Sequence, residues 1–168
     1  DRRYVDLSPA ASNCNFVANL YYASMSLMSK SCAYGLRAMM YLAGRNDPGY
    51  VSIRQMSDEL DISFHFLTKV LQHLTAAGLL HSSRGINGGV NLAKPAKKIS
   101  LLDIVMATED RDLFTTCALG LAGCGEKCPC PLHQEWSKER KRIQAIFKKT
   151  TLDTLAGPIA RGTLRLIN

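Results

Sequence analysis

The chain has 168 residues, of which 46% are hydrophobic and 21% are charged, so its composition is that of a globular protein and excludes a disordered or fibrous one. This length allows one domain with an added dimerisation element and excludes most large enzyme folds. The formal net charge of +7 favours an anionic partner such as nucleic acid. No Asp or Glu occurs from Ile62 to Leu102, and this absence predicts a positive face on the folded protein.

The N-terminal segment, residues 1–24, has no regular apolar periodicity, and we expect a poorly ordered extension outside the functional domain. No apolar run in it approaches the length of a signal-peptide core or a membrane-spanning helix. We therefore expect a cytoplasmic protein without a membrane partner. Cytosolic thiols are normally reduced, so the six cysteines indicate metal ligands or redox sensors rather than structural disulfides.

Two helices are predicted in the segment that follows. Residues 34–42 combine apolar with small side chains, which suits a buried helix that ends at Gly44. Ser52 and Gln55 have the spacing of a capping box, in which each side chain accepts a hydrogen bond from the backbone N–H of the other residue. They predict a helix of about two turns that ends at Asp61.

A further helix is predicted from Ser63, because apolar residues recur there at the i, i+3, i+4 and i+7 positions until Gly78. Two short helices separated by about three residues form a helix-turn-helix, whose second helix enters the major groove of DNA. The exposed positions of this helix all carry hydrogen-bonding side chains: His65, Thr68, Lys69, Gln72 and His73. The alternative, a merely solvated helix face, is disfavoured by the absence of acidic residues here.

Residues 79–83 and 90–92 predict two strands around a glycine-rich tip, which together form a wing beside the helix-turn-helix. Arg84 at this tip suits the minor groove of DNA, and the neighbouring glycines let the backbone come close to it. A hairpin exposed only to solvent is the alternative. The candidate DNA contacts are Ser63, His65, Thr68, Lys69, Gln72, Arg84, Gly85 and Asn87.

Ser100 and Asp103 form another capping-box pattern and predict a helix that extends through Met106. Farther along, from Leu132 to about Thr150, apolar residues share one helical face while basic residues occupy the rest. This long helix has no evident partner in so small a domain. We interpret it as a dimerisation helix, with an ordinary core helix as the alternative.

Residues 115–131 contain four Cys, three Gly and two Pro, so they predict an irregular loop. Thiolates bind zinc or iron–sulfur clusters, and a loop rich in glycine and proline lets backbone N–H groups turn toward cluster sulfurs. Six residues separate Cys117 from Cys124, whereas structural zinc sites have two short ligand pairs. The spacing therefore favours a cluster over zinc, and either metal site over unliganded cysteines.

Four stretches of the chain form a specific combination. They are Met25-Ser-Leu-Met-Ser-Lys, Tyr34-Gly-Leu-Arg-Ala-Met, the wing tip at residues 84–89, and the cysteine loop that runs into Pro131-Leu132-His133. Together with the helix-turn-helix, they resemble the winged-helix iron–sulfur regulators, the family of IscR, NsrR, RirA and CymR. The resemblance covers Met25 to about Ala156. It implies a mainly α fold with a small β-hairpin wing, in which a winged helix-turn-helix domain precedes a long dimerisation helix.

The resemblance also implies an iron–sulfur cluster held by Cys117, Cys124 and Cys130, with His133 as the fourth ligand. Cys128 is an additional cysteine in this chain and is the alternative ligand. A 2Fe-2S cluster is favoured, with 4Fe-4S as the alternative. The expected parts are the extension at 1–24, the DNA-binding domain at 25–110, the cluster-binding loop at 111–133, and the dimerisation helix with a C-terminal tail at 134–168.

We therefore expect a homodimeric transcription factor that binds double-stranded promoter DNA and has no catalytic residues. Its affinity for DNA is expected to change with the cluster, which would sense iron, redox state or nitric oxide. The first alternative is a zinc- or thiol-based winged-helix regulator without a cluster. The second is a small cysteine-dependent oxidoreductase, which is disfavoured because the chain has no C-x-x-C pair.

Overall fold

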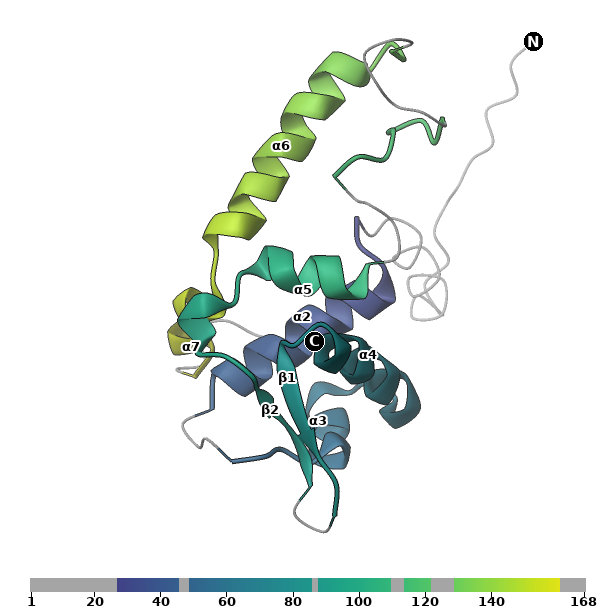
Figure 1. Cartoon of the computed structure of the whole chain (residues 1–168). Coiled ribbons are helices and arrows are strands. Elements are labelled where there is room, and N and C mark those ends of the chain that lie inside the picture. Colours follow the sequence, from purple (N-terminus) through teal and green to yellow (C-terminus); the bar gives the residue numbers. More distant parts are fainter. Residues whose placement is uncertain (1–26, 46–48, 86–87, 110–113, 122–128, 161–168) are drawn as a thin grey trace, which may run out of the picture.

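The computed structural model describes residues 27–45, 49–85, 88–109, 114–121 and 129–160 (Figure 1). Their elements are α2 (Lys30–Ala43), α3 (Ile53–Leu60), α4 (Phe64–Ala76), β1 (Leu80–Ser83), β2 (Gly89–Leu92), the 3-10 helix η1 (Ala96–Lys98), α5 (Leu101–Thr108), α6 (His133–Lys149) and α7 (Leu152–Ala160). The predicted fold class, mainly α with one β-hairpin, is confirmed. The expected N-terminal extension lies outside the described residues.

Helix α2 is the central helix of the fold. It begins after Ser29, whose side-chain oxygen accepts a hydrogen bond from the backbone N–H of Cys32 at 3.1 Å, and it ends at Gly44 as predicted. Its buried face, which includes the fully buried Met39, contacts α4, α5 and α7. In Figure 1, α2 lies between α5 on one side and the helix-turn-helix on the other. The hydrophobic core is therefore built around α2.

Helices α3 and α4 form the predicted helix-turn-helix. The side chain of Ser52 caps α3 by accepting the Gln55 N–H at 3.5 Å, but the second half of the predicted capping box is wrong. The Gln55 amide instead donates to the Glu59 carboxylate, one turn farther along the helix, at 2.8 Å. Asp61 ends α3 in the left-handed region, with φ of 50°. Ser63 precedes α4, but its side chain makes no capping hydrogen bond to this helix. The Ser63 side chain is exposed.

Strands β1 and β2 form the predicted hairpin, an antiparallel pair in which Ser83 lies opposite Gly89. Val51, just before α3, adds a short bridge to Val90, where each backbone N–H donates to the other residue's carbonyl at 2.9 Å. A Cβ on Gly89 would lie 2.1 Å from the Val51 carbonyl oxygen. Gly89 is therefore required by packing inside the protein, whereas the sequence analysis explained the wing glycines by approach to DNA.

Helix α5 begins with a complete capping box, as predicted. The Ser100 hydroxyl oxygen accepts the Asp103 N–H at 3.2 Å, and the Asp103 carboxylate accepts the Ser100 N–H at 2.9 Å. Helix α6 extends away from the other helices over much of its length (Figure 1). Near its C-terminal end, Ile143 and Phe147 pack against the core, and α6 contacts α5.

Helix α7 returns the chain to the core beside α2. The backbone N–H of Leu152 donates to the Ile99 carbonyl at 3.0 Å, and the Leu101 N–H donates to the Thr150 carbonyl at 2.9 Å. Leu152 is fully buried. Helix α7, which was expected to belong to a C-terminal tail, is thus part of the same core as the helix-turn-helix. Nowhere in the described part does a helix have the length and apolar character needed to cross a membrane.

Candidate DNA-binding groove and cysteine pair

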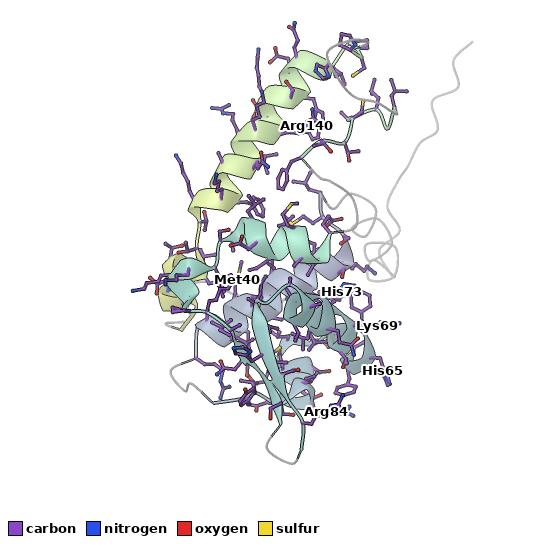
Figure 2. The ribbon with its side chains drawn as sticks, in the orientation of Figure 1. Met40, His65, Lys69, His73, Arg84 and Arg140 are labelled. Carbon is purple, nitrogen blue, oxygen red and sulfur yellow. The ribbon has the colours of Figure 1, made fainter. Side chains whose placement is uncertain are left out.

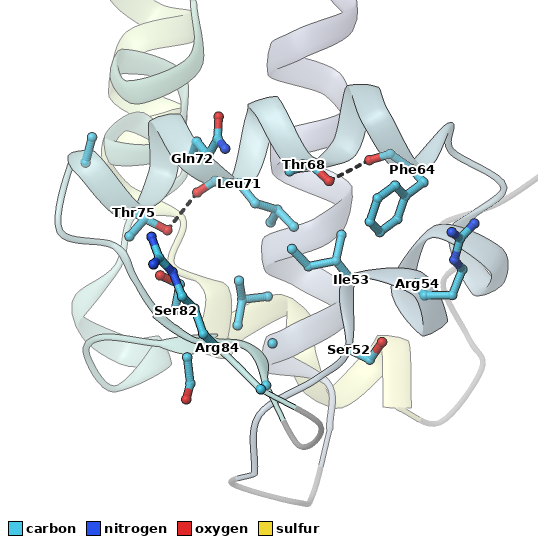
Figure 3. Close-up of a pocket in the computed structure, with 16 residues that line it drawn as sticks. Ser52, Ile53, Arg54, Phe64, Thr68, Leu71, Gln72, Thr75, Ser82 and Arg84 are labelled. Carbon is cyan, nitrogen blue, oxygen red and sulfur yellow. Dashed lines mark hydrogen bonds between the residues drawn. The ribbon is translucent and has the colours of Figure 1, made fainter.

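A groove of about 780 Å³ lies between α4, the first turn of α3 and the β-hairpin (Figure 3). Polar and cationic side chains line it, and among the described residues that line it none is acidic. The groove combines the elements that winged helix-turn-helix proteins present to DNA. Its lining includes Ser52, Arg54, Thr68, Gln72, Thr75, Ser82, Arg84 and Gly85.

Arg54 and Arg84 lie at opposite sides of this groove (Figure 3). The Arg54 guanidinium lies over the Phe64 ring, 4.4 Å from its centre, and this stacking restrains its orientation. Neither arginine belongs to an ion pair in the part of the chain that the structure describes. Arg54 was not among the DNA contacts predicted from the sequence. Its position could have been noticed in the sequence, because Arg54 lies in the first turn of α3, and the N-terminus of a helix also attracts phosphate.

The polar residues of α4 divide into two groups. Thr68 and Gln72 line the groove, whereas His65 and Lys69 do not. Figure 2 shows His65, Lys69 and His73 in a row along the outer side of α4. The Thr68 hydroxyl donates to the Phe64 carbonyl of its own helix at 2.7 Å, so its proton is already used and its oxygen can still accept a hydrogen bond.

The remaining candidate DNA contacts lie at the edges of this surface or outside the described residues. Ser63 is exposed before the first turn of α4 and does not line the groove. Gly85 lines the groove at the wing tip and has φ of +110°. This backbone conformation favours glycine, so the tip conformation depends on Gly85. Asn87 lies outside the described residues.

The structure brings Cys117 and Cys130 together at the start of α6. Their Sγ atoms are 3.7 Å apart, with Cys117 buried and Cys130 half-buried. The backbone N–H of His133, the first residue of α6, donates to the Cys130 carbonyl at 2.9 Å. Cys124 and Cys128 lie outside the described residues. Within the described ranges, no three His, Cys, Asp or Glu side chains form a group able to hold a metal ion.

The separation of the two thiols suits shared coordination of a metal. Tetrahedral sulfur ligands with metal–sulfur bonds of about 2.3 Å lie about 3.8 Å from each other. The observed 3.7 Å between the Cys117 and Cys130 sulfurs agrees with two ligands of one metal atom.

Cys32 is a buried cysteine of another kind. It lies in the first turn of α2, where its thiol donates to the Met28 sulfur at 3.6 Å. Burial raises the pKa of this thiol to about 11, so it stays protonated near neutral pH. Reactivity and metal binding require the thiolate. Cys32 therefore acts as a small core residue of α2.

One carboxylate connects the end of α5 to α2. Glu109 Oε2 accepts hydrogen bonds from the Ser29 N–H at 3.0 Å and from the Ser29 hydroxyl at 3.1 Å. Glu109 is the last described residue before the segment that leads to Cys117. Since α2 packs against α4, this contact connects the end of α5 to the helix-turn-helix.

Comparisons with known proteins agree with this arrangement. Residues 28–158 match the profile of the Rrf2 family, described as iron-dependent transcriptional regulators. An Aquifex aeolicus protein, provisionally named an HTH-type transcriptional regulator, is 33% identical over 131 residues, which span 77% of this chain and 90% of that protein. The structure of CymR, the global cysteine regulator of B. subtilis, is similar with a TM-score of 0.67 and 26% identity over 79% of this chain and 98% of CymR. T. potens IscR is similar with a TM-score of 0.64 and 25% identity over 82% of this chain and 91% of IscR.

Proposed function

Because this chain belongs to the Rrf2 family of transcriptional regulators, we propose that it binds promoter DNA as a homodimer under the control of an iron–sulfur cluster. It is a transcriptional regulator and not an enzyme. The observation that carries the cluster proposal is the 3.7 Å separation of the Cys117 and Cys130 sulfurs in a cysteine-rich segment. This separation is the one expected for thiolates on one metal atom.

For DNA, we propose that α4 enters the major groove with Thr68 and Gln72 toward the base edges. The Gln72 amide can pair with adenine, and the Thr68 methyl group can contact thymine. Arg54 and Arg84, on either side of the groove, contact the DNA backbone and the adjacent minor groove. The other predicted contacts, Ser63, His65, Lys69, Gly85 and Asn87, would reach flanking phosphates.

The proposed dimer forms through α6. Ile143 and Phe147 of α6 pack against the core of the same chain, so part of the apolar face of α6 is already buried within the monomer. Ile146, on the same helix, is 60% exposed and is available to a second copy. Much of α6 extends away from the other helices, which leaves room for a partner helix beside it (Figure 1).

For the cluster, we propose Cys117, Cys124 and Cys130 as ligands with His133 as the fourth, and Cys128 as the alternative. When bound, such a cluster supplies an iron centre that responds to iron supply, oxidants or nitric oxide. The chain itself would transmit the change, because Glu109 holds the start of α2 and α2 packs against α4. A loop that tightens or relaxes would thereby shift the DNA-reading helix.

The cluster proposal is tested by purifying the full chain without oxygen and measuring absorbance, iron and acid-labile sulfide. We expect a coloured protein with equal amounts of iron and sulfide. His133→Ala should weaken the cluster's stability in air more than Cys128→Ala does. A cluster lost only in Cys128→Ala would assign an all-cysteine site, and a colourless protein without iron would contradict the proposal.

A second candidate function rests on the same pair of thiols. Cys117 and Cys130 are close enough to form a disulfide after a small rotation, with two electrons and two protons passing to hydrogen peroxide, which becomes water. Such a protein would be a thiol-based regulator without a cluster. It would be purified colourless, and peroxide would remove two free thiols per chain and change its DNA affinity.

A further inference from the structure

Arg140 is the one described residue of α6 that is buried, with 8% of its surface exposed. Its neighbours Glu139 and Lys141 are exposed, as is usual for a helix on the protein surface. Burial of a guanidinium group carries a large desolvation cost unless hydrogen bonds and an opposite charge compensate for it. The surroundings of Arg140 therefore indicate what this side chain interacts with.

The Arg140 side chain holds the residue that precedes Cys117. Its Nη1 donates to the Thr116 carbonyl at 3.0 Å, and the indole Nε1 of Trp136, one turn earlier on α6, donates to the same carbonyl at 2.9 Å. Figure 2 shows Arg140 on α6, beside the cysteine-containing segment. Since Cys130 is hydrogen-bonded to the first residue of α6, this helix restrains the backbone at both cysteines.

The charge of Arg140 has no carboxylate partner in the described part of the chain. The ion pairs there join Glu135 to Lys138 and Glu139 to Arg142, all of which are exposed. The Nε of Arg140 is buried and has no hydrogen-bond partner among the residues that the structure describes. A buried cation in this state still lacks an anion. Cysteine ligands become anionic when they bind a metal, and the adjacent Cys117–Cys130 pair is therefore a source of that charge.

We propose that Arg140 is a positioning residue for the Cys117–Cys130 pair, in which it anchors Thr116 and offsets the negative charge of the metal-bound thiolates. This inference rests on the proposed metal site and adds a residue to it. It predicts that loss of the Arg140 charge weakens metal binding, although Arg140 is not itself a ligand. Residues behind the ligands commonly have this effect, typically about 10- to 100-fold in metal affinity.

The test is an anaerobic titration of the reduced, metal-free full chain with Co²⁺, followed by the cobalt–thiolate charge-transfer absorbance. Arg140→Gln keeps a hydrogen-bond donor but removes the charge, and we expect its Kd for Co²⁺ to rise by about 10-fold or more. Arg140→Lys keeps the charge and should lie between Arg140→Gln and the wild type. Arg142→Gln is the matched control, because Arg142 lies two residues away with a 76% exposed side chain, and we expect no change in Kd.

Circular dichroism and thermal unfolding of each metal-free variant show whether it is folded. If Arg140→Gln does not fold, the comparison is made between Arg140→Lys and the wild type. Equal Kd values for the wild type, Arg140→Gln and Arg140→Lys would overturn the inference and leave the metal site standing. If Arg142→Gln weakened Co²⁺ binding as much as Arg140→Gln, the inference would also be overturned, because the effect would then come from the net charge of the protein and not from the position of Arg140. A wild type without a cobalt–thiolate band would overturn the proposed metal site, and this inference with it.

Discussion

The two groove arginines should determine much of the salt dependence of DNA binding. Arg54 and Arg84 face the groove from opposite sides, and neither is in an ion pair with a described residue. Each is therefore available to displace a counterion from DNA. The perturbation is Arg84→Ala, with Arg54→Ala as the second variant. The matched control is Arg142→Ala on α6, since Arg142 is engaged by Glu139 at 3.3 Å and does not line the groove.

The expected magnitude follows from the number of cations removed. A homodimer carries two copies of Arg84, and each phosphate neutralised contributes about 0.9 to the slope of log K against log salt concentration. Arg84→Ala should therefore lower the magnitude of this slope by about 1.8. When the salt concentration rises from about 50 to about 200 mM, the factor by which Kd increases should therefore be about 12-fold smaller for Arg84→Ala than for the wild type. Arg54→Ala should have an effect of similar size.

Fluorescence anisotropy with a labelled promoter duplex measures Kd at several salt concentrations for the wild type and each variant. The control Arg142→Ala should keep the wild-type slope. If Arg84→Ala and Arg54→Ala keep the wild-type slope as well, these arginines do not contact DNA. The groove would then not be the DNA-binding surface.

Three further predictions concern base reading, the wing and the buried thiol. Gln72→Ala should change the preference among promoter variants by about 1–3 kcal/mol in competition binding, whereas an equal loss on every sequence would argue against base contact. Gly89→Ala should destabilise the fold by about 2 kcal/mol in urea unfolding, because its Cβ would strain the two Val51–Val90 hydrogen bonds, each worth about 1 kcal/mol; an unchanged midpoint would refute this. Cys32, with a pKa of about 11, should be about one part in a thousand thiolate at pH 8, so iodoacetamide should label it only after unfolding; rapid labelling of native protein, seen by mass spectrometry, would show that the thiol is accessible.

Local sequence patterns were sufficient to predict most of the helices and strands. The capping pair Ser100 and Asp103 forms as predicted because both partners lie within one helical turn. Gln55 departs from its predicted role because Glu59 offers its amide a carboxylate on the same helix face. The role of Gly89 depends on Val51, which lies 38 residues earlier, and no local pattern contains that contact.

The candidate sites were predicted only in part, for the same reason. The sequence identified Thr68, Gln72 and Arg84, but the division of α4 into a groove side and an outer side depends on where the hairpin packs. Arg54 was missed because its importance arises from its position across the groove from Arg84. Arg140 reads as one of several basic residues on an amphipathic helix, and only its burial distinguishes it.

The proposed function requires that the cysteine region control DNA binding. The most direct test is to measure Kd for promoter DNA on one anaerobic preparation, before and after removal of its iron with a chelator under reducing conditions. We expect the two Kd values to differ by about 5- to 150-fold, the usual range for coupling between two sites. Identical Kd values for the iron-loaded and iron-free protein would contradict it.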